Sequence, residues 1–341
     1  MKKQKTVCIC GGHGFIGHHI ARRLKNEGWW VRTVDIAEYT YGEIDFSDDY
    51  VIGDLRNPMV VSKVLFNDKK GFDGHQHSLS DKENSFDLVI QLAADMGGLG
   101  FLQSGDNDAD VMHNSALINL NVAHYAVQNN VKKIYYSSSA CIYPLELQED
   151  SNNTGLKESD AIPAHPDLCY GWEKLFSEIL YDAFNRNYNL DIAIGRFHNI
   201  FGIEGTYEGI RAKAPAAICR KVAMANDGDE IEIWGTGEAT RSFLEVDECI
   251  EGILRLIENG YNKPLNIGSD EMVSVNQLAE MVIRISGKKL TIKNIQNDLV
   301  GVMGRNSENT LIEQTLNWRP VEKLETGITK LYNWINKQIN G

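Results

Sequence analysis

The sequence lacks any long hydrophobic run. No apolar stretch among its 341 residues approaches the roughly 18 residues that a membrane-spanning helix needs. The first residues, MKKQKTVCICGG, contain lysines followed by an apolar run that is too short for the core of a secretory signal. These absences predict a cytoplasmic protein with no membrane partner.

Positive charge is also scarce. The chain has 34 lysines and arginines against 47 aspartates and glutamates, which gives a formal net charge of −13. Because an acidic chain repels the phosphate backbones of DNA and RNA, we expect no nucleic-acid partner. An anionic ligand such as a nucleotide would have to be bound by local arginine and lysine side chains.

Cysteines are few and scattered. None of the six has the spacing of a small disulfide-bonded domain, so we expect reduced thiols. Cys8 and Cys10 share one face of a predicted strand, where core packing outweighs metal binding. The pair His18–His19 and the pair His75 and His77 have no third ligand nearby and are interpreted as structural or solvent-facing. The sequence therefore predicts no metal site.

What is present is the pattern of an α/β fold. The composition, 43% hydrophobic and 24% charged, is that of an ordinary folded protein. Apolar strands alternate with amphipathic helical segments up to about residue 200, which predicts a Rossmann-like, doubly wound parallel sheet with helices on both faces. The predicted strands are 6–10, 29–35, 50–54, 86–94, 132–138 and 191–197, and the predicted helices are 16–27, 108–130 and 171–187.

A glycine-rich loop joins the first predicted strand to the first predicted helix. In GGHGFIG, the glycines permit a tight turn and close approach to a diphosphate, while the helix start offers free N–H groups. The residues predicted to bind the dinucleotide here are Gly11, Gly14, Phe15, Ile16 and Gly17.

Acidic residues at later strand ends indicate which dinucleotide binds. Asp35 ends the second predicted strand, where a carboxylate would bind ribose hydroxyls, and no arginine follows it in DIAEY, so NAD is favoured over NADP. Asp54 fits the adenine edge, although such a residue alone would more often cap a helix. Leu92, Ala93 and Ala94 follow the fourth strand, where the sheet opens to the cofactor.

Two units are expected. Residues 1–200 would form the NAD-binding Rossmann-like domain, with a polar surface excursion at 67–85. Residues 201–341 would form mainly a smaller substrate-binding domain, interwoven with the first, because the regular alternation fades after residue 200.

A Tyr-x-x-x-Lys motif indicates hydride chemistry. Tyr170 and Lys174 would lie one turn apart on one helix face, so that the lysine charge could lower the pKa of the phenol and let Tyr170 act as a base. Ser139, at the end of the fifth strand, could hydrogen-bond the same substrate hydroxyl. The motif alone is common by chance, but its combination with the glycine loop is specific.

These features together resemble the extended short-chain dehydrogenase/reductase superfamily, whose members modify nucleotide sugars. Ala140 and Cys141 stand where the 4,6-dehydratases typically carry an acidic residue, so dehydration would lack its acid. Within the superfamily the chain is most similar to the GDP-mannose 3,5-epimerase family. The matching stretches are LAADMGGLGFLQS (92–104), SSACIYP (138–144), KESDA (157–161), GRFHNIFG (195–202), KAPAAICRK (213–221), TRSF (240–243), NIGSDEMVS (266–274) and GRNS (304–307).

This resemblance implies a function and a set of site residues. It implies conversion of GDP-mannose to GDP-L-galactose, with Cys141 and Lys213 as an acid/base pair beside Ser139, Tyr170 and Lys174. It also implies a homodimer formed through the two long helices. The residues that it places at the sugar nucleotide are Gly98, Ser139, Asn199, Lys213, Arg241 and Arg305.

Other interpretations remain open. Cys141 alone would more often be a small buried residue, and Lys213 a solvated lysine in a polar loop. The chain could instead be a related GDP-sugar enzyme, for example one acting on a GDP-heptose, that only oxidises or epimerises C4. A non-catalytic NAD-binding scaffold is disfavoured, because a scaffold needs neither Ser139 nor the Tyr170–Lys174 pair.

Overall fold

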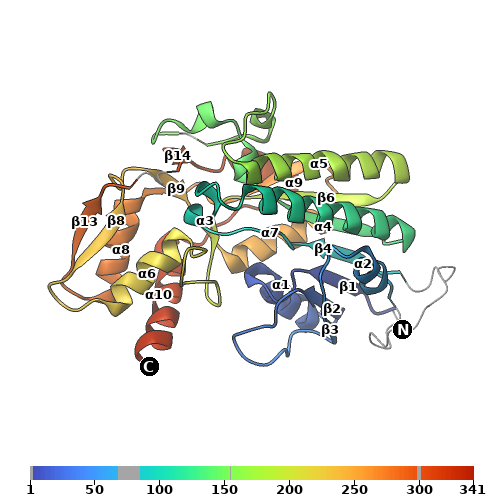
Figure 1. Ribbon diagram of the computed structural model, residues 1–341, viewed down its shortest axis with the longest axis horizontal. Helices are drawn as coiled ribbons and strands as arrows, with labels where there is room; N and C mark the ends of the chain where they lie inside the picture. Colours follow the sequence, from blue (N-terminus) through green and yellow to red (C-terminus); the bar gives the residue numbers. More distant parts are fainter. Residues whose placement is uncertain (1–2, 68–84, 154, 298–300) are drawn as a thin grey trace.

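The protein is built on a seven-stranded parallel sheet. The computed structural model describes residues 3–67, 85–153, 155–297 and 301–341 (Figure 1). The strand order is β11-β6-β5-β4-β1-β2-β3, and every neighbouring pair is parallel. The strands are β1 (Thr6–Cys10), β2 (Trp30–Asp35), β3 (Asp49–Ile52), β4 (Leu88–Gln91), β5 (Lys133–Ser139), β6 (Asp191–Phe197) and β11 (Pro264–Ile267).

This topology confirms the predicted fold class and all six predicted strands. The order reverses between β1 and β4, and in such sheets ligands bind outside the carboxyl ends of the strands at this switch point. The sequence did not predict β11, the seventh strand, which pairs with β6 although nearly 70 residues separate them. The stretch PLNI is only four residues long and, although α7 (Val246–Asn259) precedes it, lies beyond the regular alternation that ends near residue 200.

The central strands are buried on both faces, as expected for a parallel sheet covered by helices. In β1, Val7 and Ile9 pack into the core on one face, and Cys8 and Cys10 pack into the core on the other. All four side chains are fully buried. The interpretation of Cys8 and Cys10 as core residues is therefore confirmed.

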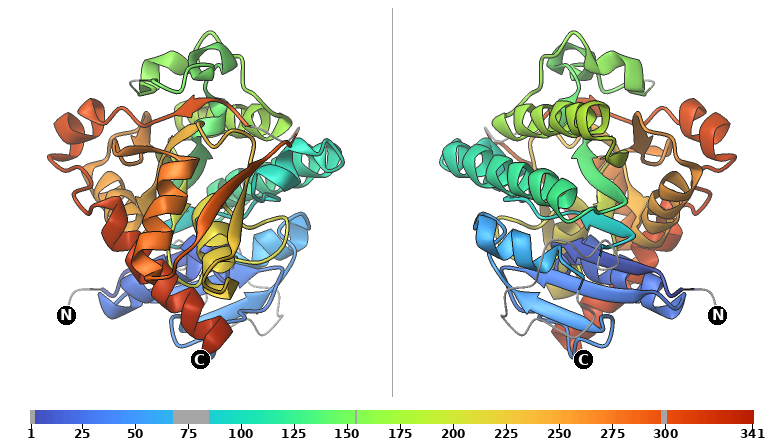
Figure 2. Two further views of the ribbon diagram at one scale, coloured as in Figure 1. Left: turned by 90° about the vertical axis from the view of Figure 1, so that its left-hand side faces the viewer. Right: turned by 90° about the vertical axis from the view of Figure 1, so that its right-hand side faces the viewer.

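Helices cover both faces of the sheet (Figures 1 and 2). The face that carries Val7 packs against α1 (Phe15–Asn26), α7 (Val246–Asn259) and α9 (Thr310–Leu316). The opposite face packs against α2 (Pro58–Val64), α4 (Asp108–Gln128) and α5 (Cys169–Tyr188). The helices predicted at 16–27, 108–130 and 171–187 are confirmed as α1, α4 and α5, and α3 (Leu99–Gln103) precedes α4.

A smaller unit has its own core. Strands β8 (Glu230–Trp234) and β13 (Thr291–Ile295) pair in parallel beside α6 (Ala214–Met224), α8 (Val275–Ser286) and α10 (Leu324–Asn340). Between these elements the chain returns to the main sheet through α7 and β11, so the two units interweave. The division at residue 200 remains a prediction.

Short elements connect the two units. Three 3₁₀ helices follow β5, namely η2 (Ala140–Ile142), η3 (Leu145–Gln148) and η4 (Glu158–Ala161). The connecting strands are β7 (Ile200–Phe201), β9 (Thr240–Ser242), β10 (Leu244–Glu245), β12 (Met272–Ser274) and β14 (Gly304–Arg305).

Two sequence predictions concern residues that the structure does not describe. The excursion predicted at 67–85 lies outside the described residues except for its two end residues, and so do His75 and His77. Within the ranges that are described, none of the helices is both long and apolar enough to cross a membrane.

Candidate active site

The glycine loop packs tightly between β1 and α1. A Cβ atom on Gly17 would lie 2.0 Å from the carbonyl oxygen of Gly11, so only glycine lets the loop close on the helix. Gly14 is the N-cap of α1 and provides no side-chain hydrogen bond, and no acidic residue lies in the first turn. The helix N-terminus, including Phe15 and Ile16, is thus left to an anionic partner, and a cofactor diphosphate fits it.

Asp35 and the segment after β4 lie beside this loop. The Asp35 carboxylate accepts hydrogen bonds from the backbone N–H groups of His13 (3.1 Å) and Ala37 (3.1 Å). Leu92 N donates to the carbonyl of Cys10 (3.0 Å), and a Cβ on Gly11 would lie 2.9 Å from Ala93 N. The structure brings these predicted cofactor residues together, and their roles remain predictions.

Asp54 is held by its neighbour Arg56. The guanidinium donates to both carboxylate oxygens at 2.8–3.0 Å, and this hydrogen bonding lowers the pKa of Asp54. The alternative interpretation of Asp54 as a helix cap is wrong, because the side chain of Asn57 caps α2 by accepting from Met59 N. Contact of Asp54 with adenine remains a prediction.

Ser139, Tyr170 and Lys174 come together where β5 ends against the first turns of α5. Lys174 Nζ donates to the carbonyl of Ser137 (2.9 Å) and lies 5.5 Å from the ring centroid of Tyr170. Burial lowers the pKa of Lys174. Burial also raises the pKa of Tyr170, and a hydrogen bond with Ser139 partly opposes this rise.

The expectation that Lys174 lowers the pKa of Tyr170 is therefore not met in this structure. Tyr170 is only 7% exposed, and the loss of hydration is the largest cause of its raised pKa.

Cys141 lies on η2, one residue beyond Ala140 at the end of β5. Its backbone N–H donates to Ser139 Oγ (3.2 Å), which ties the thiol to the hydride-transfer residues. Arg305 Nη1 donates to Cys141 Sγ (3.1 Å). The remaining guanidinium nitrogens of Arg305 donate to Gln148 Oε1 (2.5 Å) and to the carboxylate of Asp167 (2.6 Å). A buried positive charge is therefore fixed against the sulfur.

Lys213 is the N-cap residue of α6 and faces the same centre. Burial lowers the pKa of its amine, and the nearby Cys141 opposes this. The alternative of a freely solvated lysine is wrong, because the side chain is partly buried and within electrostatic reach of the thiol. A lowered pKa suits an amine that must accept and return a proton.

Gly98 supports the segment that leads to Lys213. Its N–H donates to the carbonyl of Arg211 (3.1 Å), and a Cβ there would lie 2.5 Å from the carbonyl oxygen of Ala212. The space that a side chain at position 98 would need is occupied by the protein's own backbone. Contact of Gly98 with the sugar remains a prediction.

Arg241 lies on β9, the middle strand of the small β12-β9-β14 sheet, and Asn199 contacts this strand from just before β7. Arg241 donates to the carbonyls of Thr240 (2.7 Å) and Val302 (2.6 Å), and burial, together with the charge of Arg305, lowers its pKa to about 9. Asn199 Nδ2 donates to the carbonyl of Ser242 (2.9 Å). Such a desolvated arginine is suited to an anionic ligand.

Two residues that sequence reasoning missed complete the surroundings of Cys141. Gln148 and Asp167 hold the guanidinium of Arg305, and no local motif singles them out. Asp167 lies three residues before Tyr170, which is the only signal that could have drawn attention to it.

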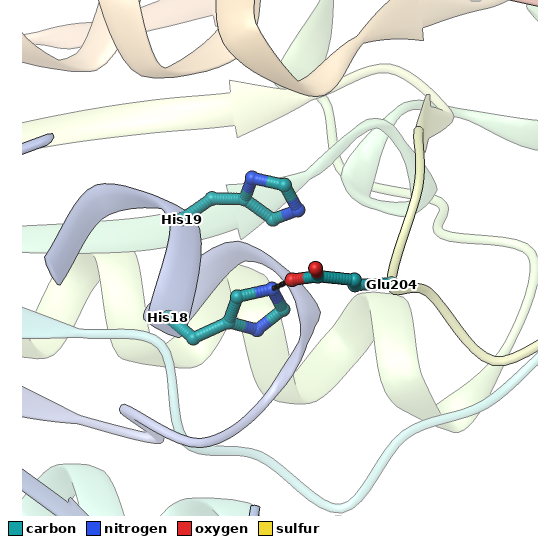
Figure 3. Close-up of side chains that lie close together, drawn as sticks. All are labelled: His18, His19 and Glu204. Carbon is teal, nitrogen blue, oxygen red and sulfur yellow. Dashed lines mark ion pairs between the residues drawn. The ribbon is translucent and has the colours of Figure 1, made fainter. Parts of the chain in front are cut away.

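The interpretation of His18 and His19 needs correction. Both side chains are buried, so of the two alternatives the structural one holds, and Glu204 lies beside them as a third potential ligand that the sequence does not show nearby (Figure 3). Glu204 lies 186 residues downstream of His18, so no local spacing could reveal it.

Comparisons with known proteins identify the family. Residues 7–268 match the NAD dependent epimerase/dehydratase family. The chain is 45% identical over 334 residues to a protein of Arabidopsis thaliana named GDP-mannose 3,5-epimerase, covering 98% of this chain and 82% of that protein. It is 44% identical over the same length to GDP-mannose 3,5-epimerase 1 of Oryza sativa subsp. indica, again with 98% and 82% coverage.

Solved structures show the same fold. UDP-glucose 4-epimerase of Thermotoga maritima superposes with a TM-score of 0.81 at 22% identity, covering 98% of this chain and 100% of that one. UDP-glucose 4-epimerase of Thermus thermophilus, solved with NAD, gives 0.78 at 19% identity, with 97% and 98% coverage.

Proposed function

The chain belongs to the NAD dependent epimerase/dehydratase family, and on this basis we propose that it is a GDP-mannose 3,5-epimerase. It would convert GDP-mannose to GDP-L-galactose by transient oxidation at C4, proton exchange at C3 and C5, and reduction at C4. The names of its 44–45% identical plant relatives support this substrate.

One observation carries the proposal, namely the position of Cys141. Its thiol lies next to Ser139 and Tyr170, where a simple C4 oxidation needs no sulfur, and it has Lys213 within electrostatic reach. A sugar C–H group is far too weak an acid for any side chain, but a C–H next to a ketone is not. A second proton-transfer pair beside the hydride site is what epimerisation at C3 and C5 requires.

The residues have separate tasks in this scheme. Tyr170 accepts the proton of the C4 hydroxyl, while Ser139 holds that oxygen and Lys174 fixes the tyrosine. When bound, NAD supplies the hydride chemistry by accepting a hydride from C4 and returning it. Cys141 and Lys213 remove and return the protons at C3 and C5 from opposite sides of the ring, so the reaction is redox-neutral overall.

Binding tasks are proposed for the remaining residues. The cofactor would be held by Gly11, Gly14, Phe15, Ile16, Gly17, Asp35, Asp54 and 92–94, in a first domain of residues 1–200. Gly98 and Asn199 of the first domain, together with Arg241 and Arg305 of the mainly C-terminal domain, would contact the sugar nucleotide. The protein would act in the cytoplasm as a homodimer.

Exchange with solvent tests the function. Incubated with GDP-mannose in deuterium oxide and followed by NMR, the protein should place deuterium at C3 and C5. Cys141→Ala should lose this exchange by at least a hundredfold, within the range that removal of a general acid or base costs. Cys169→Ala, which removes a neighbouring, partly buried thiol, is the matched control and should exchange normally.

Other outcomes favour other functions. Accumulation of NADH without exchange would indicate a C4 dehydrogenase acting on a GDP-sugar, and absence of turnover would indicate another sugar or a scaffold. Full exchange in Cys141→Ala would show that Cys141 has only a packing role.

A further inference from the structure

A second cluster of reactive side chains lies behind the glycine loop, outside the site described above. His18 and His19 project from α1, and Glu204 reaches them from the segment after β7 (Figure 3). One potential ligand atom from each residue lies within 4.8 Å of the others. His18 Nε2 is 2.8 Å from Glu204 Oε2, and the His18 side chain is fully buried. None of these residues has a task in the proposed reaction.

Backbone carbonyls determine which ring nitrogens are free. His18 Nδ1 lies 2.9 Å from the carbonyl oxygen of Gly14, and His19 Nε2 lies 3.1 Å from that of Ile203. Because a carbonyl oxygen only accepts hydrogen bonds, these two nitrogens must carry the protons. Neutral rings then present the lone pairs of His18 Nε2 and His19 Nδ1. Histidines that bind metals are typically oriented by such a hydrogen bond to a carbonyl.

The free nitrogen of His18 is not satisfied by hydrogen bonding. Its lone pair faces a carboxylate oxygen, which is repulsive unless a proton or a cation compensates, and the described part of the chain offers this nitrogen no hydrogen bond of good geometry. A cation bound between the two groups would neutralise this repulsion.

The backbone at Glu204 is consistent with a built site. Its φ of 56° lies in the left-handed region, which costs a non-glycine residue free energy and is found most often where surrounding contacts demand it. Tyr39 Oη donates to Glu204 Oε2 at 3.0 Å and fixes the carboxylate toward the histidines.

We propose that His18, His19 and Glu204 bind one divalent transition-metal ion, with Zn²⁺ the best match, and that a water molecule completes the tetrahedron. Two imidazole nitrogens and one carboxylate oxygen suit zinc and not magnesium or calcium. Ligands about 2.1 Å from a tetrahedral zinc lie about 3.4 Å apart, so side-chain shifts of about 1 Å would close the site. The ion would link α1 to the segment that leads to Lys213.

One neighbour opposes the ion. Arg22 Nη1 lies 3.4 Å from Glu204 Oε2 and would repel a cation, although its side chain is 36% exposed and can turn into solvent. We therefore expect that removing the Arg22 charge increases the affinity for the metal ion.

Metal titration of the full-length protein tests the proposal. Chelator-treated, NAD-loaded protein is titrated with Zn²⁺ by calorimetry, and with Co²⁺ as a visible-absorption probe. We expect one site, at least tenfold weaker in Glu204→Gln and His19→Gln and severalfold tighter in Arg22→Gln. Arg23→Gln, the adjacent arginine that pairs with Glu27 and Glu251, is the matched control and should not change the affinity.

Each other result would overturn the site. These results are no binding by the wild type, equal affinity in Glu204→Gln, no tightening in Arg22→Gln, or the intense near-ultraviolet band of Co²⁺–thiolate ligation. Circular dichroism and NAD retention identify variants that fail to fold. If His19→Gln fails to fold, the substitution of the partly exposed Arg22 still decides the question.

Discussion

At the residue scale, Cys141 lies among basic side chains. Arg305 donates to its sulfur at 3.1 Å, and the thiol also acts electrostatically on the pKa values of Lys213 and Arg241. Asp167 and Gln148 fix Arg305 from its far side. Negative charge that develops on sulfur or on a sugar oxygen here would meet fixed positive charge in a desolvated site, where electrostatic stabilisation is strong.

A single carboxylate is expected to shape the pH dependence of stability. Glu245 is only 6% exposed and caps α7 by accepting from Asp247 N (2.6 Å). Burial, together with the charge of Asp247, raises the pKa of Glu245 to about 7. Between the unfolded value near 4.5 and this value, the folded state binds more protons, so its stability falls as pH rises through 7.

We therefore predict that Glu245→Gln flattens this part of the stability profile. The amide keeps the cap hydrogen bond without ionising, so urea unfolding should show the variant gaining up to about 3 kcal/mol relative to wild type between pH 5 and pH 8. The exposed Glu258→Gln on the same helix should follow the wild-type profile. A constant difference between Glu245→Gln and wild type at all pH values would contradict the argument.

At the element scale, the contact between α5 and η2 positions the hydride-transfer residues relative to Cys141. Tyr170 and Lys174 lie on α5, while Cys141 lies on η2, and the two elements are in close contact. A Cβ atom on Gly171 would lie 2.1 Å from the carbonyl oxygen of Cys141. The absence of a side chain at this position therefore sets the distance between the thiol and the hydride-transfer residues.

Gly171→Ala should separate these elements. The added methyl group would force α5 from η2, lowering turnover at least tenfold and the free energy of unfolding by about 1–3 kcal/mol, as overpacking typically does. Turnover of GDP-mannose and urea unfolding measure the two effects. Asn187→Ala, at the exposed end of α5, is the control. Helix propensity alone predicts the opposite sign for Gly171→Ala, about 1 kcal/mol of stabilisation, and such a gain would contradict the close contact.

At the scale of the whole molecule, the two long helices present an apolar surface. α4 and α5 pack side by side (Figure 1), and both expose large hydrophobic side chains. These are Met112 (37% exposed), Leu120 (41%), Trp172 (45%), Phe176 (44%) and Ile179 (58%). On α5 they follow helical spacing along one stripe, which is the pattern expected of an interface and supports the proposed homodimer.

A charge in this stripe should dissociate the dimer. Ile179→Glu buries a carboxylate in an apolar interface, so sedimentation velocity should show dimeric wild type and a monomeric variant. Val321→Glu, at a hydrophobic residue that is 80% exposed elsewhere, should remain dimeric. A monomeric wild type at micromolar concentration would remove the basis of the proposed dimer.

Much of the architecture could be read from local patterns. Six strands of the main sheet and the three long helices are confirmed because continuous apolar strands and amphipathic helices depend on nearest neighbours along the chain. The membership of the family is confirmed as well. Strand β11 was missed, because its pairing with β6 depends on a crossover rather than on its own four residues.

The sequence by itself determined the class of fold, the glycine loop with Asp35, and the Tyr170–Lys174 spacing, since each depends on residues held within one turn or one strand end. Only the tertiary structure decided what surrounds Cys141 and His18. Arg305 lies 164 residues from Cys141, and Glu204 lies 186 residues from His18. Contacts at such separations arise where the chain crosses the carboxyl edge of the sheet, and short-range spacing carries no information about them.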